Sequence, residues 1–337
     1  MRKIIFLLAI LFVGRCFGDS VFVELSNVPA DGFVVAPLDM TPAANWLETN
    51  LLEATEFYYG DKKIDAVFVP DNSYISDRGT FVAVLPDDVP KGKPIRLRLE
   101  NTQGYADIKR ANFIYPFTAT GASTKIVFDK ERQGGLPSSI TFADGKMLDT
   151  MKWFDRLHDP DTGSCNITNV AYNYPVVIEE RPFLQVVPAW MNFQGTNASV
   201  QYLWFIFPQR ELIYVTGVMY QSELRAWKEK HLLELHIPDG SFGKWFGDDK
   251  SGTFTGTKQS QTFSRYSDST CSHQATFRFN NSKEICFGVT SSTVSGQIRH
   301  SATASQRRCS RISSAEAFGS MGWYDNMVFH ALSRTPS

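Results

Sequence analysis

The sequence shows almost no helical periodicity and no basic cluster. Only two short segments, 44–54 and 147–157, place apolar residues at helical spacing, and the second fits a strand as well. A bundle of amphipathic helices is therefore excluded. The 34 Lys and Arg residues are balanced by 35 acidic residues and form no block, so neither nucleic acid nor an anionic membrane surface is expected as a partner.

Recognisable catalytic and metal-binding motifs are also missing. The chain has no Cys-x-x-Cys pair and no cluster of Cys and His at zinc-ligand spacing. It has no Gly-x-Ser-x-Gly, no phosphate-binding glycine loop and no His-Glu-x-x-His. We therefore predict neither a metal nor an organic cofactor.

The N-terminus has the order of residues found in a secretory signal. Two basic residues precede the apolar run 4–13, and small residues before Asp19 suit cleavage at that point. The run is too short for a membrane span, which needs roughly 20 residues. A lipid anchor on Cys16 is the alternative, but Arg15 stands where such a signal needs a small residue. We predict a secreted or periplasmic protein, free of the membrane once residues 1–18 are removed.

Four cysteines remain after this cleavage, and an even number in an oxidising compartment allows disulfides. Three pairings are open. Cys271 and Cys286 flank a predicted hairpin and form the favoured pair. The full set is Cys165, Cys271, Cys286 and Cys309.

Short runs rich in Val, Ile, Phe and Tyr recur along the chain, separated by Gly, Pro, Asp and Asn. This spacing predicts an all-β fold made of antiparallel sandwiches. Clear examples lie at 21–25, 32–35, 66–69, 81–85 and 95–99.

The strand pattern changes twice, which predicts three regions after the signal. Residues 19–112 form a small β-sandwich cap, and the longer strands of 113–290 form a large antiparallel β-supersandwich that is incomplete. Residues 291–337 are rich in Ser, Arg and Ala and are predicted to be an irregular or disordered tail. A chain truncated or shifted out of frame after about residue 289 is the alternative explanation of that composition.

Two segments carry residues that strand periodicity does not explain. The first is 134–142, Gly-Gly-Leu-Pro-Ser-Ser-Ile-Thr-Phe, followed by the Trp-Phe-Asp-Arg of 153–156. The second is 227–239, Trp-Lys-Glu-Lys-His-Leu-Leu-Glu-Leu-His-Ile-Pro-Asp. Together they resemble the galactose-mutarotase-like β-supersandwich of bacterial polysaccharide-processing proteins. The segments 69–71 and 80–85 resemble the cap of exo-acting rhamnogalacturonan lyase-like proteins.

The resemblance implies a protein that acts on or binds polysaccharide or oligosaccharide. This architecture hosts lyases, hydrolases, epimerases and non-catalytic binding modules, so the fold alone does not choose among them. Two hypotheses stay open: a carbohydrate-active enzyme with lyase or hydrolase chemistry, and a non-catalytic carbohydrate-binding or structural module. The sequence does not predict the oligomeric state.

Three of the four candidate catalytic residues lie in the second segment, and the fourth, Arg156, lies in the first. On an extended strand, Glu234 and His236 share one face while His231 belongs to the other. A carboxylate beside an imidazole favours a general base. Arg156 is the candidate cation for the carboxylate of a uronate sugar. The alternative is that these groups are structural hydrogen-bonding residues.

The candidate substrate-binding residues are the carboxylates Asp155 and Asp239 and the aromatic ring of Trp245. Hydrolysis needs two carboxylates at a set separation, and Asp155, Glu234 and Asp239 are available for it. Trp245 lies in a Gly- and Asp-rich segment and is predicted to be an exposed platform for a sugar ring, whereas Trp204 lies in an apolar run and is predicted to be core. Asp155 and Arg156 can equally form an ion pair that pins a loop.

Overall fold

The structure, a computed structural model, confirms the all-β prediction: the residues that it describes form antiparallel strands and no α-helix. The segment 44–54, one of the two helical candidates, and Cys271 lie outside these residues. No described helix is long and apolar enough to cross a membrane. The described residues are 11–15, 21–40, 55–70, 78–101, 109–112, 116–122, 124–129, 135–142, 145, 147–148, 152–153, 155–159, 163–166, 177–210, 212–221, 229–231, 235–236, 242–247, 250–253, 272–279, 286–292 and 324–332.

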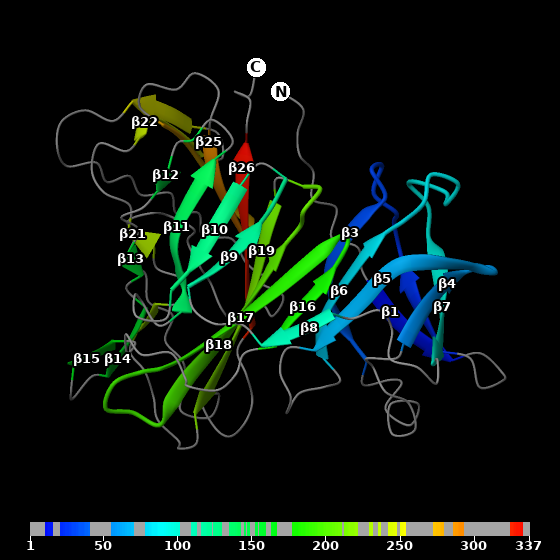
Figure 1. The fold of residues 1–337 in the computed structure, drawn as a ribbon, viewed down its shortest axis with the longest axis horizontal. Coiled ribbons are helices and arrows are strands. Elements are labelled where there is room, and N and C mark those ends of the chain that lie inside the picture. The colour runs from blue at the N-terminus through cyan, green and yellow to red at the C-terminus, as the bar shows by residue number, and fades with distance from the viewer. Residues whose placement is uncertain are drawn as a thin grey trace. The chain divides into compact units, whose positions relative to one another are not determined.

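The chain divides into two compact units, residues 1–109 and 110–337. Unit 1 is one sheet with the strand order β1-β2-β7-β4-β5-β6-β3 (Figure 1). Its strands are β1 (Leu11–Arg15), β2 (Val21–Leu25), β3 (Phe33–Asp39), β4 (Thr55–Tyr59), β5 (Lys62–Pro70), β6 (Arg78–Val84) and β7 (Ile95–Asn101).

The long strand β5 turns this sheet into two layers. Its first residues, 62–64, pair with β4, and its later residues, 65–70, pair with β6. Between the layers, the rings of Phe57 and Phe81 meet edge to face with their centroids 5.1 Å apart. Alternation along β2 supports the same core, because Val21, Val23 and Leu25 are buried while the residues between them are half-buried.

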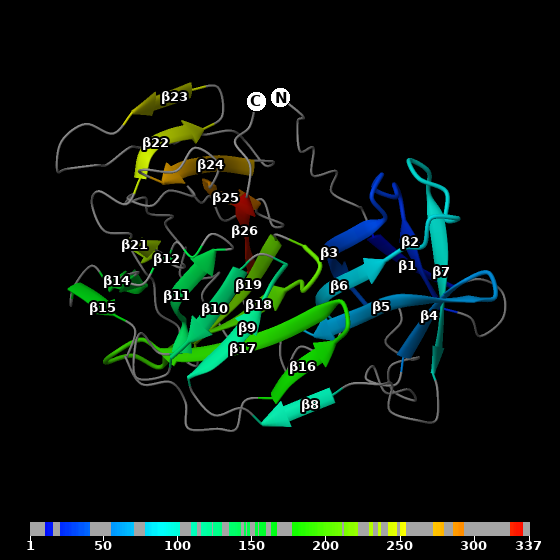
Figure 2. The ribbon, with the colours of Figure 1, turned by 45° about the horizontal axis from the view of Figure 1, so that its top comes forward.

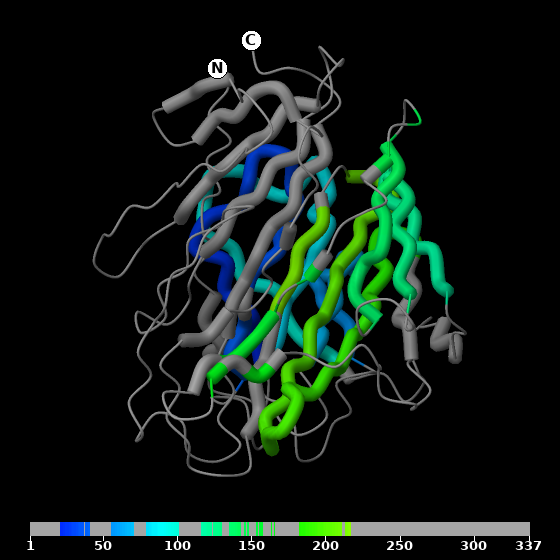
Figure 3. Tube along the Cα trace, turned by 90° about the vertical axis from the view of Figure 1, so that its left-hand side faces the viewer, coloured from blue at the N-terminus to red at the C-terminus, as the bar shows by residue number. Residues whose placement is uncertain are grey.

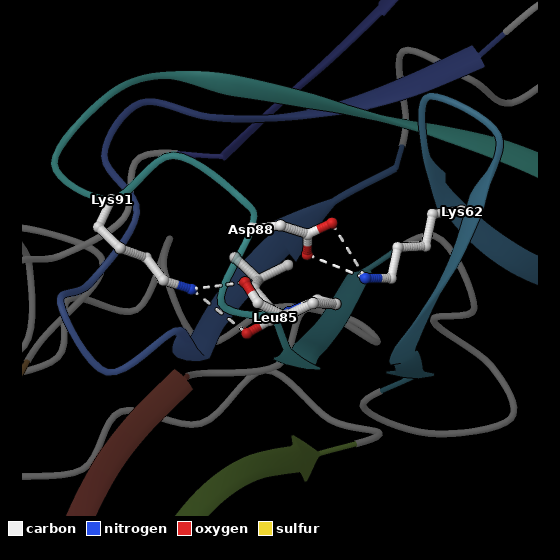
Figure 4. A network of polar contacts seen from close by, with 5 residues as sticks. Lys62, Leu85, Asp88 and Lys91 are labelled. Atoms are coloured by element: carbon white, nitrogen blue, oxygen red, sulfur yellow. Dashed lines mark hydrogen bonds and ion pairs between the residues drawn. The ribbon is translucent and has the colours of Figure 1, made fainter.

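A lysine and an aspartate fix the turn that follows β6. Lys91 Nζ donates hydrogen bonds to the backbone oxygens of Pro86 at 2.9 Å and Leu85 at 3.3 Å, and Asp88 pairs with Lys62 at 2.9 Å (Figure 4). The hydrogen bond from Lys62 lowers the pKa of the Asp88 carboxyl. This turn closes on Gly32, whose φ of 68° suits glycine and whose Cβ, if present, would lie 2.5 Å from the Leu85 oxygen.

Unit 2 contains a ten-stranded sheet with the order β23-β22-β24-β25-β26-β19-β18-β17-β16-β8. Its strands are β8 (Lys109–Asn112), β16 (Val177–Arg181), β17 (Leu184–Asn192), β18 (Ala198–Ile206), β19 (Leu212–Gln221), β22 (Phe242–Gly247), β23 (Lys250–Thr253), β24 (Ser272–Phe279), β25 (Cys286–Ser292) and β26 (Tyr324–Leu332).

The described residues of unit 2 form three smaller sheets as well, in the orders β12-β11-β10-β9, β13-β21 and β15-β14-β20. Figure 2 shows the first of them, with β9, β10, β11 and β12 side by side. The strands of the three sheets are β9 (Phe117–Thr120), β10 (Thr124–Phe128), β11 (Pro137–Phe142), β12 (Met147–Leu148), β13 (Lys152–Trp153), β14 (Arg156–Asp159), β15 (Gly163–Asn166), β20 (Glu229–His231) and β21 (Leu235–His236). The described strands of the ambiguous segment 147–157 are therefore short: they cover residues 147–148, 152–153 and 156–157.

The core of unit 2 lies between β17–β19 and β9–β11, which Figure 3 shows as two facing layers. Trp204 on β18 is 1% exposed, which confirms the prediction that it is a core residue. Its ring meets those of Phe128 and Trp153 edge to face, at centroid distances of 5.8 and 5.6 Å. These aromatic contacts tie β18 to β10 and to β13, the strand that leads into the candidate site.

The prediction of an irregular tail over residues 291–337 is wrong for residues 324–332. They form β26, which pairs with β19 on one side and β25 on the other, so this late segment lies inside the ten-stranded sheet. The Ser- and Arg-rich stretch that suggested a tail ends before this strand, whose own residues include the apolar run Met327–Val328–Phe329. Apolar and β-branched residues of this kind suit a sheet interior.

Candidate functional site

The site is built on an extended segment whose alternate residues are buried. Trp153 is 7% exposed, Asp155 and Leu157 are 0% exposed, and Arg156 between the last two is half-buried. Because side chains alternate along an extended chain, the buried residues fix the segment from below and leave Arg156 on the opposite side. The segment joins β13 to β14.

Two buried hydrogen bonds hold this segment in place. The indole nitrogen of Trp153 donates to the backbone oxygen of Pro137 at 2.8 Å. The hydroxyl of Tyr202, which is itself 0% exposed on β18, donates to Oδ2 of Asp155. A hydrogen bond to a buried carboxylate is strong because water cannot compete for it. The backbone that carries Arg156 is thus anchored to an interior strand of the ten-stranded sheet.

Strand β14 is the middle strand of the three-stranded sheet β15-β14-β20. Arg156 has His231 of β20 as its direct register partner on one side and Asn166 of β15 on the other. Residues directly opposite each other in an antiparallel pair have Cβ atoms about 4.5–5.5 Å apart. Arg156 and His231 are far apart in the sequence, and both are candidates because of their residue type. The sheet makes them neighbours.

The next row on the same face is also polar. His158 is two residues after Arg156 and has Glu229 and Ser164 as its register partners. Because strand residues alternate between the two faces of a sheet, both rows share one face, and the pair Leu157 and Cys165 between them belongs to the other face. One face of this sheet therefore carries two rows of polar residues: Asn166, Arg156 and His231, then Ser164, His158 and Glu229. We refer to these six positions as the polar face.

The predicted strand through His231 and His236 is described only at its two ends, which form two short strands, and residues 232–234 between them lie outside the described residues. His231 ends β20, which pairs with β14, whereas His236 lies on β21 and has Lys152 of β13 as its partner. The two strands pair with β14 and β13, which lie after and before Asp155 in the chain. Glu234 and Asp239, the other two candidates of this segment, lie outside the described residues.

The remaining two candidates occupy positions that differ from the predicted ones. Asp155 is fully buried and accepts the hydrogen bond of Tyr202, so it supports Arg156 from below and is not open to substrate. Trp245 lies within β22, where Gly252 of β23 and Phe277 of β24 are its register partners, and not in a loop. The sequence Phe242–Gly247 supports a strand because aromatic residues favour pleated, paired backbone.

Sequence reasoning did not select His158, Glu229, Ser164, Asn166 or Tyr202. The spacing Arg156-x-His158 and Glu229-x-His231 was the available signal, since residues two apart share a strand face.

Among the residues that the structure describes, no group of three His, Cys, Asp or Glu is arranged to hold a metal ion. By residue type, the six positions of the polar face carry amide, hydroxyl, carboxylate, guanidinium and imidazole groups.

Comparisons with known proteins give structural neighbours only. No family model and no curated protein matches the chain. One similar solved structure is an alpha-mannosidase from Enterococcus faecalis V583, with 9% identity and a TM-score of 0.43 over 96% of this chain and 42% of that chain. Another is a protein in the glycosyl hydrolase family 38 from Enterococcus faecalis, with 8% identity and a TM-score of 0.42 over 96% of this chain and 43% of that chain. The chain spans less than half the length of either neighbour.

Proposed function

We propose that this protein is an exported carbohydrate-active protein that binds an acidic polysaccharide on the polar face and cleaves it by β-elimination. The register pairing of Arg156 with His231 is the observation that supports this most directly. A guanidinium binds a carboxylate through two parallel hydrogen bonds, which suits the carboxylate of a uronate sugar. An imidazole beside it is a base near neutral pH.

In the proposed reaction, the first row of the polar face supplies the cation and the base, and the second row supplies the acid. Arg156 neutralises the uronate carboxylate, which makes the C5 hydrogen more acidic. His231 takes that proton as the C5–H bond breaks, the electron pair forms the C4=C5 double bond, and the C4–O4 bond breaks. His158 gives a proton to the departing O4, so that atoms and charge balance. The products are a shortened chain and an unsaturated uronate end.

Hydrolysis fits the described residues less well. Retaining and inverting hydrolysis both need two carboxylates at the scissile bond. Of the six described positions of the polar face, only Glu229 bears a carboxylate. Asp155 is excluded from such a role by its burial beneath the sheet. The elimination reaction, which needs one base and one cation, is therefore the proposal that matches the residues present.

Purified protein incubated with pectic and other uronate polysaccharides tests the proposal. We expect absorbance of the unsaturated uronate product to rise together with new reducing ends, because each elimination creates both. Neutral polysaccharides serve as matched controls and are expected to give neither signal. New reducing ends without the absorbance would replace the lyase assignment by hydrolysis. Retention on a uronate affinity gel with neither signal would favour a non-catalytic binding module.

A further inference from the structure

Unit 1 contains a strand that belongs to the predicted secretory signal. Strand β1, residues 11–15, lies at one edge of the sheet and pairs along its whole length with β2. The central register pair is Val13 opposite Val23, with Phe12 opposite Glu24 and Leu11 opposite Leu25. Cleavage before Asp19 would remove β1 and leave β2 in place.

Strand β2 is held in unit 1 independently of β1. Its other edge pairs with β7 over five residues, from Val21 opposite Leu99 to Leu25 opposite Ile95. Val23 and Leu25 are 0% exposed in the core. Without β1, the free edge of a well-ordered β2 presents unpaired backbone N–H and C=O groups, and such an edge accepts another strand.

The sequence of β2 can repeat three of the five pairings that β1 makes, and the other two place Glu24 and Leu25 where β1 has Gly14 and Arg15. In an antiparallel pair of two β2 strands centred on Val23, Val23 meets Val23, Phe22 meets Glu24, and Val21 meets Leu25. The corresponding β1 pairs are Val13 with Val23, Phe12 with Glu24, and Leu11 with Leu25. Phenylalanine and the central valine recur at the same places, and valine replaces leucine at the third. A pair centred on one residue is two-fold symmetric, as the common homodimer requires.

We propose that removal of the signal opens the edge of β2 and that β2 of a second copy takes the place of β1, which joins two unit 1 sheets into one. This interface is distinct from the polar face of unit 2, and it does not depend on the proposed reaction. The occupant is a second copy because β2 itself carries residues that match three of the five residues of β1 at the symmetric register.

Position 22 on β2 offers a test, because a charge placed there should affect the stability of the single chain and the affinity of the dimer in opposite directions. Within one chain, Phe22 lies opposite Arg98 of β7, and the Arg96 guanidinium lies 5.9 Å from the Phe22 ring centroid. A glutamate at position 22 is therefore favoured within the chain, and a lysine is disfavoured. Across the proposed interface, position 22 faces Glu24 of the second copy, so the preference is reversed.

The experiment expresses the full chain with its signal in an exporting bacterium, determines the N-terminus by mass spectrometry and measures association by analytical ultracentrifugation. We expect an N-terminus at Asp19 and a concentration-dependent dimer. Phe22→Glu is expected to raise the dimer Kd by about tenfold or more relative to Phe22→Lys, because two like-charged pairs arise per dimer. Chemical unfolding of both variants below the Kd is expected to rank Phe22→Glu as the more stable.

Three results would overturn this inference. The first is a purified chain that retains the signal, so that β1 keeps its place. The second is a processed chain that stays monomeric at every concentration measured. The third is equal dimerisation of the two variants, which would place the interface elsewhere or assign a different partner to the edge.

Discussion

Replacing Arg156 with alanine is expected to lower kcat/KM on a uronate polysaccharide by about 10²–10³-fold, the usual loss when one charge-stabilising group is removed from an active site. The side chain is half-buried and lies on the side of the segment opposite Asp155 and Leu157, so its removal opens no core cavity. We therefore expect a smaller drop in the unfolding midpoint than the truncation of a core side chain would cause. Steady-state kinetics and thermal unfolding of the same preparations measure both effects.

Two further variants separate charge from position. Arg156→Lys keeps the positive charge but loses the paired hydrogen bonds of a guanidinium, so it should recover only part of the activity. Arg98→Ala removes an arginine from unit 1, where it lies 5.2 Å from the Tyr58 ring centroid, and should leave kcat/KM unchanged. Equal activity in the wild type and Arg156→Ala would remove Arg156 from the reaction.

Replacing Tyr202 with phenylalanine is expected to lower the free energy of unfolding by about 1–3 kcal/mol, because the buried Asp155 carboxyl group loses a hydrogen-bond donor. The change removes one oxygen and leaves the aromatic ring in the core. We also expect KM for a uronate substrate to rise, since Asp155 supports the backbone that carries Arg156. Urea unfolding and substrate kinetics measure the two consequences.

A double-mutant cycle with Asp155→Asn tests whether the two groups act together. The loss in the double variant is expected to be smaller than the sum of the single losses, because either substitution disrupts the same contact. Additive losses would show that Tyr202 and Asp155 stabilise the protein separately. A rise in KM for Tyr202→Phe that Asp155→Asn does not share would contradict the supporting role of Asp155.

The fold class was predictable because short apolar or alternating runs, rich in β-branched and aromatic residues and separated by turn residues, indicate strands. Residues 198–206 are mostly apolar, and they form β18 in the interior of the ten-stranded sheet with Trp204 in the core. Strand β26 was missed because the unusual composition before it was extended to the chain end. Its position between β25 and β19 is set by pairing with strands that come earlier in the chain, which local composition does not reveal.

The candidate site was only partly predictable, for two physical reasons. Strands β20 and β21 have three and two residues, too few for alternation to show where one ends and the next begins. The role of Asp155 depends on Tyr202, which reaches it from another sheet, so its residue type alone suggested an exposed substrate ligand. Arg156 and His231 were chosen for their chemistry, and only the register of β14 and β20 makes them neighbours.

Hydrogen exchange of the His231→Ala variant with and without a uronate oligosaccharide tests most directly whether the polar face is the binding site. The variant lacks the proposed base, so it should hold the oligosaccharide without cleaving it. We predict slower amide exchange in peptides that contain residues 156–159, 163–166 and 229–231, the strands of this face. Slower exchange confined to residues 21–101 of unit 1, or unchanged exchange at saturating oligosaccharide, would contradict the assignment.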